Sequence, residues 1–413
     1  MTGRRPQGSL AGSPGKARGT KPALLATGKK LATAAALGAL ALGTSCMTPD
    51  EDTTESSLLR GPTESWPRFR GSDRHLGLVG DPPNLPSDHE PGELWSFDTG
   101  GTVESSPTVI DGTVYVGTFA NHLFALDLET GDERWRFPVG GLLRCSPGYM
   151  DGTLYFGADD DTFYAVDAET GDEKWRLALE EGGEQSSPAI VGDRVVFSGF
   201  ELTLYCADRH SGDLLWRYEM QGGISSPAVY DNIVVIGSRD GHIHAVDLES
   251  GEFRWKVDTG DIVWSSPAVV LGHGDPFVIV GSDSDWIYAL DLNTGAERWK
   301  FQTQGDVFAS AAIHDGTAYI GSGDGFMYAL DAATGAEIWK TQCDGRILAS
   351  AALTAEHVVC GSSDGNMYVL ARTDGAVAWT FFVGQKLPVW SSPALVDGRI
   401  VFGSHDQKVR AIR

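Results

Sequence analysis

The chain has 413 residues and a formal net charge of −24, and this composition excludes several classes of protein. Residues 1–45 hold seven basic residues and no acidic one, so removing them takes the net charge from −24 to −31. A surface this acidic argues against nucleic acid or anionic lipid as a main partner. The 52 glycines and the lack of helical periodicity after residue 46 predict an all-β fold.

The first element is a basic segment followed by an apolar run at residues 31–45. This run is short for a bilayer span and has the length typical of the core of a secretory signal. Arg4 and Arg5 precede Pro6, Gln7 and Gly8, which do not fit a twin-arginine signal. We therefore expect residues 1–46 to be a signal segment and the protein to be exported.

Cys46 follows two small residues and resembles the lipid-attachment cysteine of a bacterial lipoprotein signal. The match is partial, because Gly43 stands where such signals prefer leucine. Two alternatives stay open: a lipid on Cys46, giving a periplasmic or outer-membrane lipoprotein, or simple signal cleavage nearby. The acidic residues 47–65 are rich in Thr and Ser and are expected to form a disordered tether.

Residues 66–93 are rich in Pro and Gly and predict an extended lead-in. Trp66 and Phe69 stand out in this stretch. Because large aromatic side chains are usually packed, we expect these two to cover an exposed face of the first repeat.

From residue 94 onward a repeat dominates the chain. Its most regular copy is Ala289 to Trp299, a strand ending in Asp, a Thr-Gly turn and a second strand carrying Trp. The tryptophans of this motif, from Trp95 to Trp379, lie 40, 40, 41, 39, 44, 40 and 40 residues apart. A period near 40 with four short strands per unit is the signature of a β-propeller.

The repeat count predicts eight blades. Seven complete units run through residues 105–381, and an eighth begins at Ser391 but ends after three strands. The missing strand is supplied by residues 94–97, a Trp strand without a unit of its own. Docking it into the last blade closes the ring and leaves no open sheet edge. We therefore expect residues 94–413 to be an eight-bladed propeller, and the protein to be a monomer.

The repeated Ala-x-Asp-x-x-Thr-Gly-x-x-x-Trp resembles the repeat of the pyrroloquinoline quinone (PQQ)-like β-propeller family. That family includes quinoprotein dehydrogenases and non-catalytic proteins such as BamB, a lipoprotein of the outer-membrane β-barrel assembly machinery. The resemblance therefore implies the fold and leaves the function open. In its dehydrogenase branch it implies PQQ and calcium as cofactors, an adjacent Cys-Cys pair and long insertions.

The chain departs from the dehydrogenase pattern. Its five cysteines, Cys46, Cys145, Cys206, Cys343 and Cys360, are never adjacent, and its longest insertion is the short stretch at 272–276. With little loop mass above the ring, a large cofactor would have few walls. We expect no catalytic residues and no cofactor.

Other candidate sites are weaker. His242 and His244 share one strand face, but the sequence offers no obvious third ligand, so packing is favoured over metal binding. Asp159 to Asp161 lack the ligand spacing of a calcium loop. Cys343 and Cys360 could approach each other across one blade, although packed free thiols are favoured.

The repeats also act as controls for one another. Strand alternation puts the Asp-Gly and Thr-Gly turns on one face of the ring, and the more varied loops on the other. On the varied face, the residue before the Ser-Ser-Pro position is polar in blades one to three and apolar or aromatic afterwards. The eight residues are Glu104, Arg144, Gln185, Ile224, Trp264, Phe308, Leu348 and Trp390. They either rim the channel mouth, where they would bind a partner, or wedge between the blades as core.

Three function classes follow. The export signal, uniform blades and apolar rim favour a non-catalytic protein-binding scaffold of the cell envelope, similar to BamB, with Trp264, Phe308 and Trp390 as anchors. The alternatives are a PQQ-dependent dehydrogenase and a propeller that binds polysaccharide or a small molecule through Trp264 and Trp390 beside Arg144 and Glu104.

Overall fold

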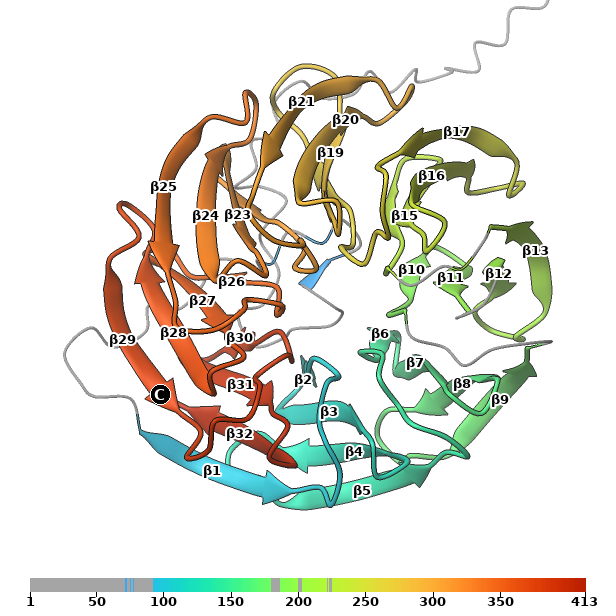
Figure 1. Ribbon diagram of the computed structural model, residues 1–413. Helices are drawn as coiled ribbons and strands as arrows, with labels where there is room; N and C mark the ends of the chain where they lie inside the picture. Colours follow the sequence, from blue (N-terminus) through green and yellow to red (C-terminus); the bar gives the residue numbers. More distant parts are fainter. Residues whose placement is uncertain are drawn as a thin grey trace, which may run out of the picture. The chain divides into compact units, whose positions relative to one another are not determined.

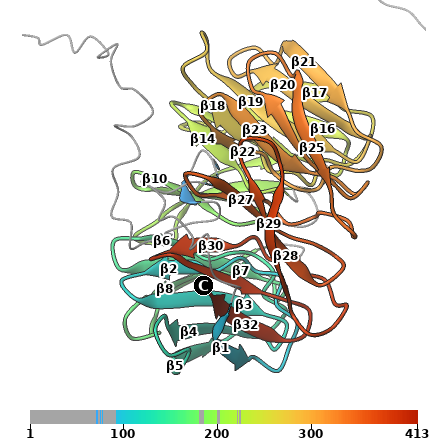
Figure 2. The ribbon, with the colours of Figure 1, turned by 90° about the vertical axis from the view of Figure 1, so that its left-hand side faces the viewer.

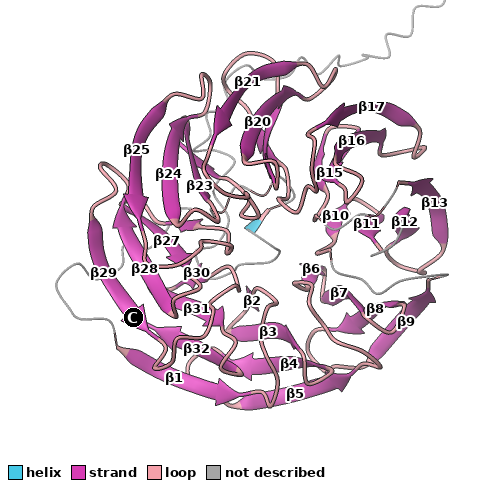
Figure 3. Ribbon diagram, viewed as in Figure 1, coloured by secondary structure: helices cyan, strands magenta, loops and turns pink. Residues whose placement is uncertain are grey.

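The computed structural model describes residues 71, 72, 75, 77, 92–179, 186–199, 203–220, 222 and 225–413. The chain divides into two units, Met1–Glu51 and Asp52–Arg413, and every described residue belongs to the second. The described residues form 32 β-strands, with no α-helix among them, in eight four-stranded antiparallel sheets arranged in a ring (Figures 1 and 3). The predicted eight-bladed propeller is confirmed. No helix in this part of the chain is long and apolar enough to span a bilayer.

The strands of the first four blades, from the channel outward, have the following bounds. Blade 1 is β2 (Thr108–Ile110), β3 (Thr113–Thr118), β4 (His122–Asp127) and β5 (Glu133–Pro138); blade 2 is β6 (Gly148–Met150), β7 (Thr153–Ala158), β8 (Thr162–Asp167) and β9 (Glu173–Ala178); blade 3 is β10 (Ala189–Val191), β11 (Arg194–Ser198), β12 (Thr203–Asp208) and β13 (Leu214–Glu219); blade 4 is β14 (Ala228–Tyr230), β15 (Ile233–Gly237), β16 (His242–Asp247) and β17 (Phe253–Asp258).

The remaining blades follow the same order. Blade 5 is β18 (Ala268–Val270), β19 (Phe277–Ser282), β20 (Trp286–Asp291) and β21 (Glu297–Gln302); blade 6 is β22 (Ala312–His314), β23 (Thr317–Gly321), β24 (Phe326–Asp331) and β25 (Glu337–Gln342); blade 7 is β26 (Ala352–Leu353), β27 (His357–Gly361), β28 (Asn366–Ala371) and β29 (Val377–Phe382); blade 8 is β30 (Ala394–Val396), β31 (Arg399–Gly403), β32 (Lys408–Ile412) and β1 (Glu93–Asp98).

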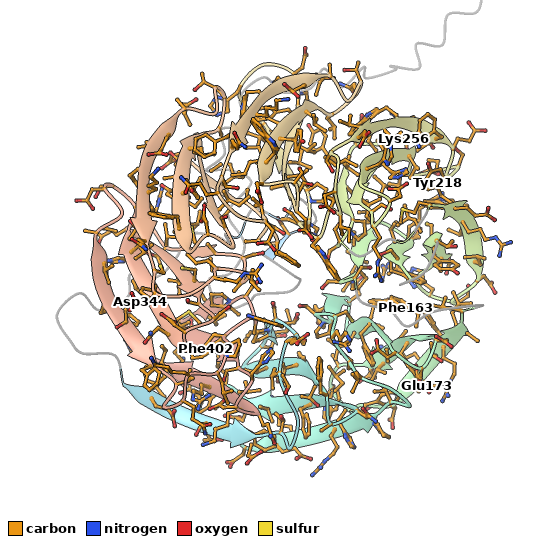
Figure 4. The ribbon with its side chains drawn as sticks, viewed as in Figure 1. Phe163, Glu173, Tyr218, Lys256, Asp344 and Phe402 are labelled. Carbon is orange, nitrogen blue, oxygen red and sulfur yellow. The ribbon has the colours of Figure 1, made fainter. Side chains whose placement is uncertain are left out.

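Each repeat folds this way because its turns and apolar runs fit one blade. At the first turn of blade 1, Asp111 and Gly112 both have positive φ, 46° and 70°, as a tight two-residue hairpin requires. The two middle strands are apolar on both faces and are buried between blades, as in β3. Core contacts cross from blade to blade: Phe163 of β8, labelled in Figure 4, stacks on Phe197 of β11 with ring centroids 3.8 Å apart.

The tryptophans of the outer strands join each blade to the next. Trp299 donates its indole N–H to Ala332 O in blade 6 at 3.0 Å, and its ring packs on Gly335, where an added Cβ would lie 2.6 Å away. Gly335 also has a φ of +73°, so the Thr-Gly turn needs glycine for two reasons. Seven tryptophans dock in this way: Trp95, Trp135, Trp175, Trp216, Trp255, Trp299 and Trp339.

A ring of serine hydrogen bonds joins the blades near the channel. The second serine of each Ser-Ser-Pro position donates its main-chain N–H to the serine hydroxyl of the next blade, at 2.9–3.0 Å. The members are Ser106, Ser146, Ser187, Ser226, Ser266, Ser310, Ser350 and Ser392. The last bond, from Ser392 to Ser106, closes the circle across the chain ends.

The eighth blade is composite, as predicted. β1 pairs antiparallel with β32, with Trp95 opposite Ala411 and Phe97 opposite Val409. Gly92 and Arg413 also exchange two main-chain hydrogen bonds at 2.9 and 3.0 Å. Figure 2 views the ring from the side, where β30 of this blade lies next to β2 of blade 1.

The described part of the lead-in contacts the inner wall of the ring. His75 Nδ1 lies 3.2 Å from Pro267 O in blade 5, and Leu353 N in blade 7 donates to Gly77 O at 2.9 Å. His75 is 2% exposed. Trp66 and Phe69, predicted to cover the first blade, lie outside the described residues, as do the signal segment, Cys46 and the tether.

Candidate functional site

The serine ring fixes the positions of the eight predicted rim residues. Each one precedes the Ser-Ser-Pro position, on the face that carries the hairpins between the second and third strands, here called the loop face. The opposite face carries the Asp-Gly and Thr-Gly turns and is called the turn face. Six of the residues are described: Glu104, Arg144, Trp264, Phe308, Leu348 and Trp390. Gln185 and Ile224 lie outside the described residues.

None of the six described rim residues belongs to the buried core. Five are half-buried, and Trp390 is 37% exposed. Their neighbours on the chain, such as Val103, Val263 and Val307, are fully buried between blades. The core position of this segment is therefore one residue earlier, and the rim residues lie at the surface of the loop face.

On the polar side, ion pairs of Arg144 connect blades 1 and 2. Arg144 Nε lies 3.1 Å from Asp159 Oδ2, and Arg144 Nη1 lies 3.6 Å from Glu104 Oε2. The guanidinium also covers the Phe119 ring at 4.6 Å, and His405 Nε2 lies 3.3 Å from Glu104 Oε1. Burial raises the pKa of Asp159, and the bond from Arg144 opposes that shift. The positive charge of Arg144 is thus paired with two carboxylates within the protein.

On the apolar side, Trp264 and Phe308 form a stacked pair across blades 5 and 6. Their ring centroids lie 5.5 Å apart with an interplanar angle of 22°. Arg346 covers the Phe308 ring at 5.8 Å and pairs with Asp306. The aromatic surface is therefore held in place before any partner arrives, which lowers the entropy cost of binding.

Trp390 stands apart from this pair. Its ring contacts His405 edge-on at 4.4 Å, and its indole N–H donates to Ser363 Oγ at 3.1 Å. It therefore lies next to the polar side, through His405 and Glu104. Among the contacts described, neither Trp264 nor Trp390 touches Arg144 or Glu104, and Trp390 approaches Glu104 only through His405.

An acidic side chain, Asp283, lies close to Trp264. Burial raises the pKa of Asp283 to about 7, with the charges of Asp306 and Asp261 adding to the shift and Trp264 and Arg346 opposing it. Its Oδ1 is buried without a hydrogen-bond partner. Sequence analysis missed this residue, because the three carboxylates come from separate loops.

A second feature that sequence analysis missed is a repeated clasp on the loop face. Asp160, Asp324 and Asp364 each accept a hydrogen bond at 2.7 Å from the tyrosine four residues later. Blade 4 replaces this tyrosine with His244, whose Nε2 lies 3.2 Å from both oxygens of Asp240. The structure thus places a third candidate ligand, Asp240, beside His242 and His244. The Asp-x-His-x-His spacing was the signal that could have found it.

The described cysteines are buried and free, which confirms the expectation of packed thiols: Cys145, Cys206, Cys343 and Cys360. The Cys343 side chain contacts Cys360 and, together with burial, raises the pKa of the Cys360 thiol. No two of these four lie next to each other in the chain.

A cavity of about 340 Å³ opens on the turn face between blades 1 and 2, lined in part by Arg134, Trp135 and Tyr149. It lies at a blade seam, away from the rim.

Comparisons with known proteins agree with this architecture. The model of a family described as outer membrane protein assembly factor BamB matches residues 88–199, 181–257 and 283–413. Among solved structures, BamB from Moraxella catarrhalis superposes with a TM-score of 0.67 at 18% identity, covering 78% of this chain and 99% of that one. A europium-containing methanol dehydrogenase gives 0.73 at 14% identity, covering 87% and 99%. Quinohemoprotein alcohol dehydrogenase from Comamonas testosteroni gives 0.73 at 15% identity, covering 87% and 82%. No curated protein sequence matches the chain.

Proposed function

Because this chain belongs to the family of the outer membrane protein assembly factor BamB, we propose that it is a non-catalytic protein-binding scaffold of the bacterial cell envelope that serves outer-membrane protein assembly. The observation that carries the proposal is the stacked Trp264 and Phe308 pair on the loop face. Aromatic side chains held rigidly at a surface are the usual anchors of protein interfaces. Trp390, 37% exposed, is a third anchor further round the rim.

The charge pattern of the rim favours a polypeptide partner. One side offers apolar rings, while on the other Arg144, Glu104 and Asp159 are paired within the protein. An extended peptide or a partner loop could lie on the apolar side and reach the polar side, whereas a small symmetric ligand would use only one.

Two observations weigh against the PQQ and calcium chemistry of a dehydrogenase. The chain has no adjacent cysteine pair. His75 and Gly77 of its own lead-in contact Pro267, next to β18 of blade 5, and Leu353, in β26 of blade 7, so the chain itself occupies part of the inner wall. Structural likeness to dehydrogenases at 14–15% identity reflects the shared fold and carries no argument for their activity.

The test is a double variant, Trp264→Ala with Trp390→Ala. We expect it to fold as the wild type does and to lose components of the barrel-assembly machinery in a pull-down from envelope extract. The matched control is Phe253→Ala with Phe382→Ala, which removes two aromatic rings that are 54% and 48% exposed but lie on outer strands. The control should retain those components. Equal capture by both double variants would contradict the proposed anchors.

The dehydrogenase alternative has its own measurement. Purified protein is incubated with PQQ and calcium, and then assayed for a quinone absorption band and for dye-linked oxidation of alcohols or sugars. We expect neither. Stoichiometric cofactor together with turnover would overturn the scaffold proposal, whatever the pull-down shows.

We further propose that the protein is exported and anchored through a lipid on Cys46. The support is the apolar run at 31–45 followed by a cysteine and an acidic stretch. Mass spectrometry of the mature N-terminus measures this directly, and a diacylglycerol-modified Cys46 is the expected species. A mature chain without lipid in the soluble periplasmic fraction would contradict the anchor.

A further inference from the structure

Blade 4 carries a group of three potential metal ligands on the loop face. Asp240 lies in the hairpin before β16, and His242 and His244 lie at the start of that strand. One ligand atom from each residue can be chosen so that all three lie within 4.8 Å of one another. We propose that Asp240, His242 and His244 bind a single divalent transition-metal ion of the zinc type.

The separations suit such an ion. Two ligands of a tetrahedral zinc, each about 2.0–2.1 Å from the metal, lie roughly 3.3 Å apart. His244 Nε2 lies 3.2 Å from either Asp240 oxygen, and His242 Nδ1 lies 3.4 Å from Asp240 Oδ1. The distances from the two histidine nitrogens to the Asp240 carboxylate are therefore already close to the separation of two ligands on one zinc ion. Two imidazoles and one carboxylate are also a donor set that zinc accepts.

A neighbouring blade orients one of the imidazoles. Tyr218 of β13 places its hydroxyl 3.1 Å from His244 Nδ1. When Nδ1 carries the proton and donates a hydrogen bond to the hydroxyl oxygen, Nε2 keeps a lone pair on the side of Asp240, which is the tautomer that a metal requires. Figure 4 labels Tyr218 and, on β17 of blade 4, Lys256, which lies opposite His244 in the strand register. Lys256 is a cation on the outer strand, and its repulsion of an added ion would lower the affinity of the site.

Access is from the side of His242. The side chains of His242, Asp240 and His244 are 24%, 12% and 3% exposed. His242 Nδ1 also lies 3.0 Å from the main-chain oxygen of Asp240, and a bound ion would replace that hydrogen bond. Three protein ligands leave a fourth position open toward solvent, where water or a partner side chain could complete the coordination.

The competing explanation is structural. His244 occupies the clasp position that Tyr328 holds in blade 6, and Tyr328 hydrogen-bonds to Asp324 in the same way. If His244 serves only as a clasp, its hydrogen bond to Asp240 explains the contact without a metal. The repeat itself supplies the variant that separates the two explanations. His242→Phe with His244→Tyr gives blade 4 the residues that blade 6 carries as Phe326 and Tyr328.

The experiment measures Zn²⁺ binding to the full chain, produced without a histidine tag and stripped of metal with a chelator. Calorimetric titration of the wild type should show one ion per chain with micromolar or tighter affinity. The His242→Phe, His244→Tyr variant should keep the wild-type unfolding midpoint and lose this binding. Tyr218→Phe should weaken binding by about 10-fold, because it removes the hydroxyl that orients the His244 ring.

The matched control is His210→Asn. His210 pairs with Asp193 at 3.2 Å on the turn face, but among the described residues it has no third potential ligand close by. Asn293 is the corresponding residue of blade 5. This variant should bind zinc as the wild type does. Absence of micromolar binding to the wild type would overturn the proposal, as would equal binding by the double variant. If the double variant is unfolded, Asp240→Asn replaces it, and unchanged binding by that variant would likewise overturn the site.

Discussion

The same repeat builds the turn face and the loop face of this propeller, but its residues vary little from blade to blade on the turn face and vary widely on the loop face. On the turn face, seven tryptophans dock on seven blades with one geometry, an indole N–H on a carbonyl 2.8–3.2 Å away. On the loop face, the rim position holds residues as different as Arg144 and Trp264. The uniform positions hold the blades together, whereas the variable rim positions are free to contact a binding partner.

The serine ring explains how the loop face can vary without loss of stability. Its eight bonds use a main-chain N–H and a hydroxyl in every blade, so they do not depend on the rim residue two positions earlier. A rim side chain can therefore be exchanged while the closure of the ring is kept. Because closure of the ring does not depend on the rim side chains, we expect variants on the two faces to differ in their effect on stability.

The largest expected effect comes from breaking the closure itself. Deleting residues 1–100 removes β1, exposes the edge of β32 and removes the Trp95 dock. We expect loss of cooperative unfolding and aggregation in size-exclusion chromatography, because an unpaired edge strand recruits other chains. Deleting residues 1–60 should leave a monomer with the unfolding transition of the longer chain.

A third truncation separates the closing strand from the lead-in. Deleting residues 1–91 keeps β1 but removes His75 and Gly77, which contact Pro267 and Leu353 on the inner wall of the ring. We expect this form to unfold cooperatively with a modest loss of unfolding free energy.

For the first truncation, a stable, monomeric fragment 101–413 would be incompatible with a composite last blade that needs β1.

The next effect compares one tryptophan from each face. Trp299 is 8% exposed and docks on Gly335, so Trp299→Ala should cost about 3–5 kcal/mol of unfolding free energy. Trp264 is half-buried and stacks on Phe308, so Trp264→Ala should cost about 1 kcal/mol, the worth of an aromatic pair. Denaturant unfolding of both variants measures the difference. Equal costs would mean that Trp264 belongs to the core and that the interface lies elsewhere.

The sequence was sufficient for the architecture because every repeat carries the same information. The blade count, the role of residues 94–97 and the position of the rim follow from periodicity and strand alternation, and the fold agrees with them. Two kinds of feature were missed on the loop face. The Asp-Tyr clasps and the group of Asp240, His242 and His244 lie within single repeats, so their spacing could have been read from the sequence. The pKa of Asp283 and the orientation of His244 depend on contacts between different repeats. Asp283 acquires its pKa from Asp261 and Asp306 on neighbouring loops, and His244 is oriented by Tyr218 of another blade. No periodicity within one repeat contains such contacts.

The last prediction concerns Asp283, whose raised pKa makes the stability of the chain depend on pH. Its pKa of about 7, raised mainly by burial, means that the folded chain holds a proton that the unfolded chain releases near the ordinary value of 3.8. The unfolding free energy therefore falls as pH rises from about 4 to about 7, and this contribution is constant above that range. Asp283→Asn has no proton to release, so it should exceed the wild type in stability by a margin that grows toward about pH 7.

Denaturant unfolding of wild type and Asp283→Asn at several values between about pH 5.5 and about pH 8.5 measures this margin across the window. The same comparison is then made in chains that also carry Asp261→Asn, which lack one of the charges that raise the pKa of Asp283. In these chains the stability difference caused by Asp283→Asn should stop growing at a lower pH. A margin that does not change with pH would show that the carboxylate is ionised throughout. It would also show that Trp264 borders a charged surface, where an aromatic anchor would be a poorer binding site for an apolar partner.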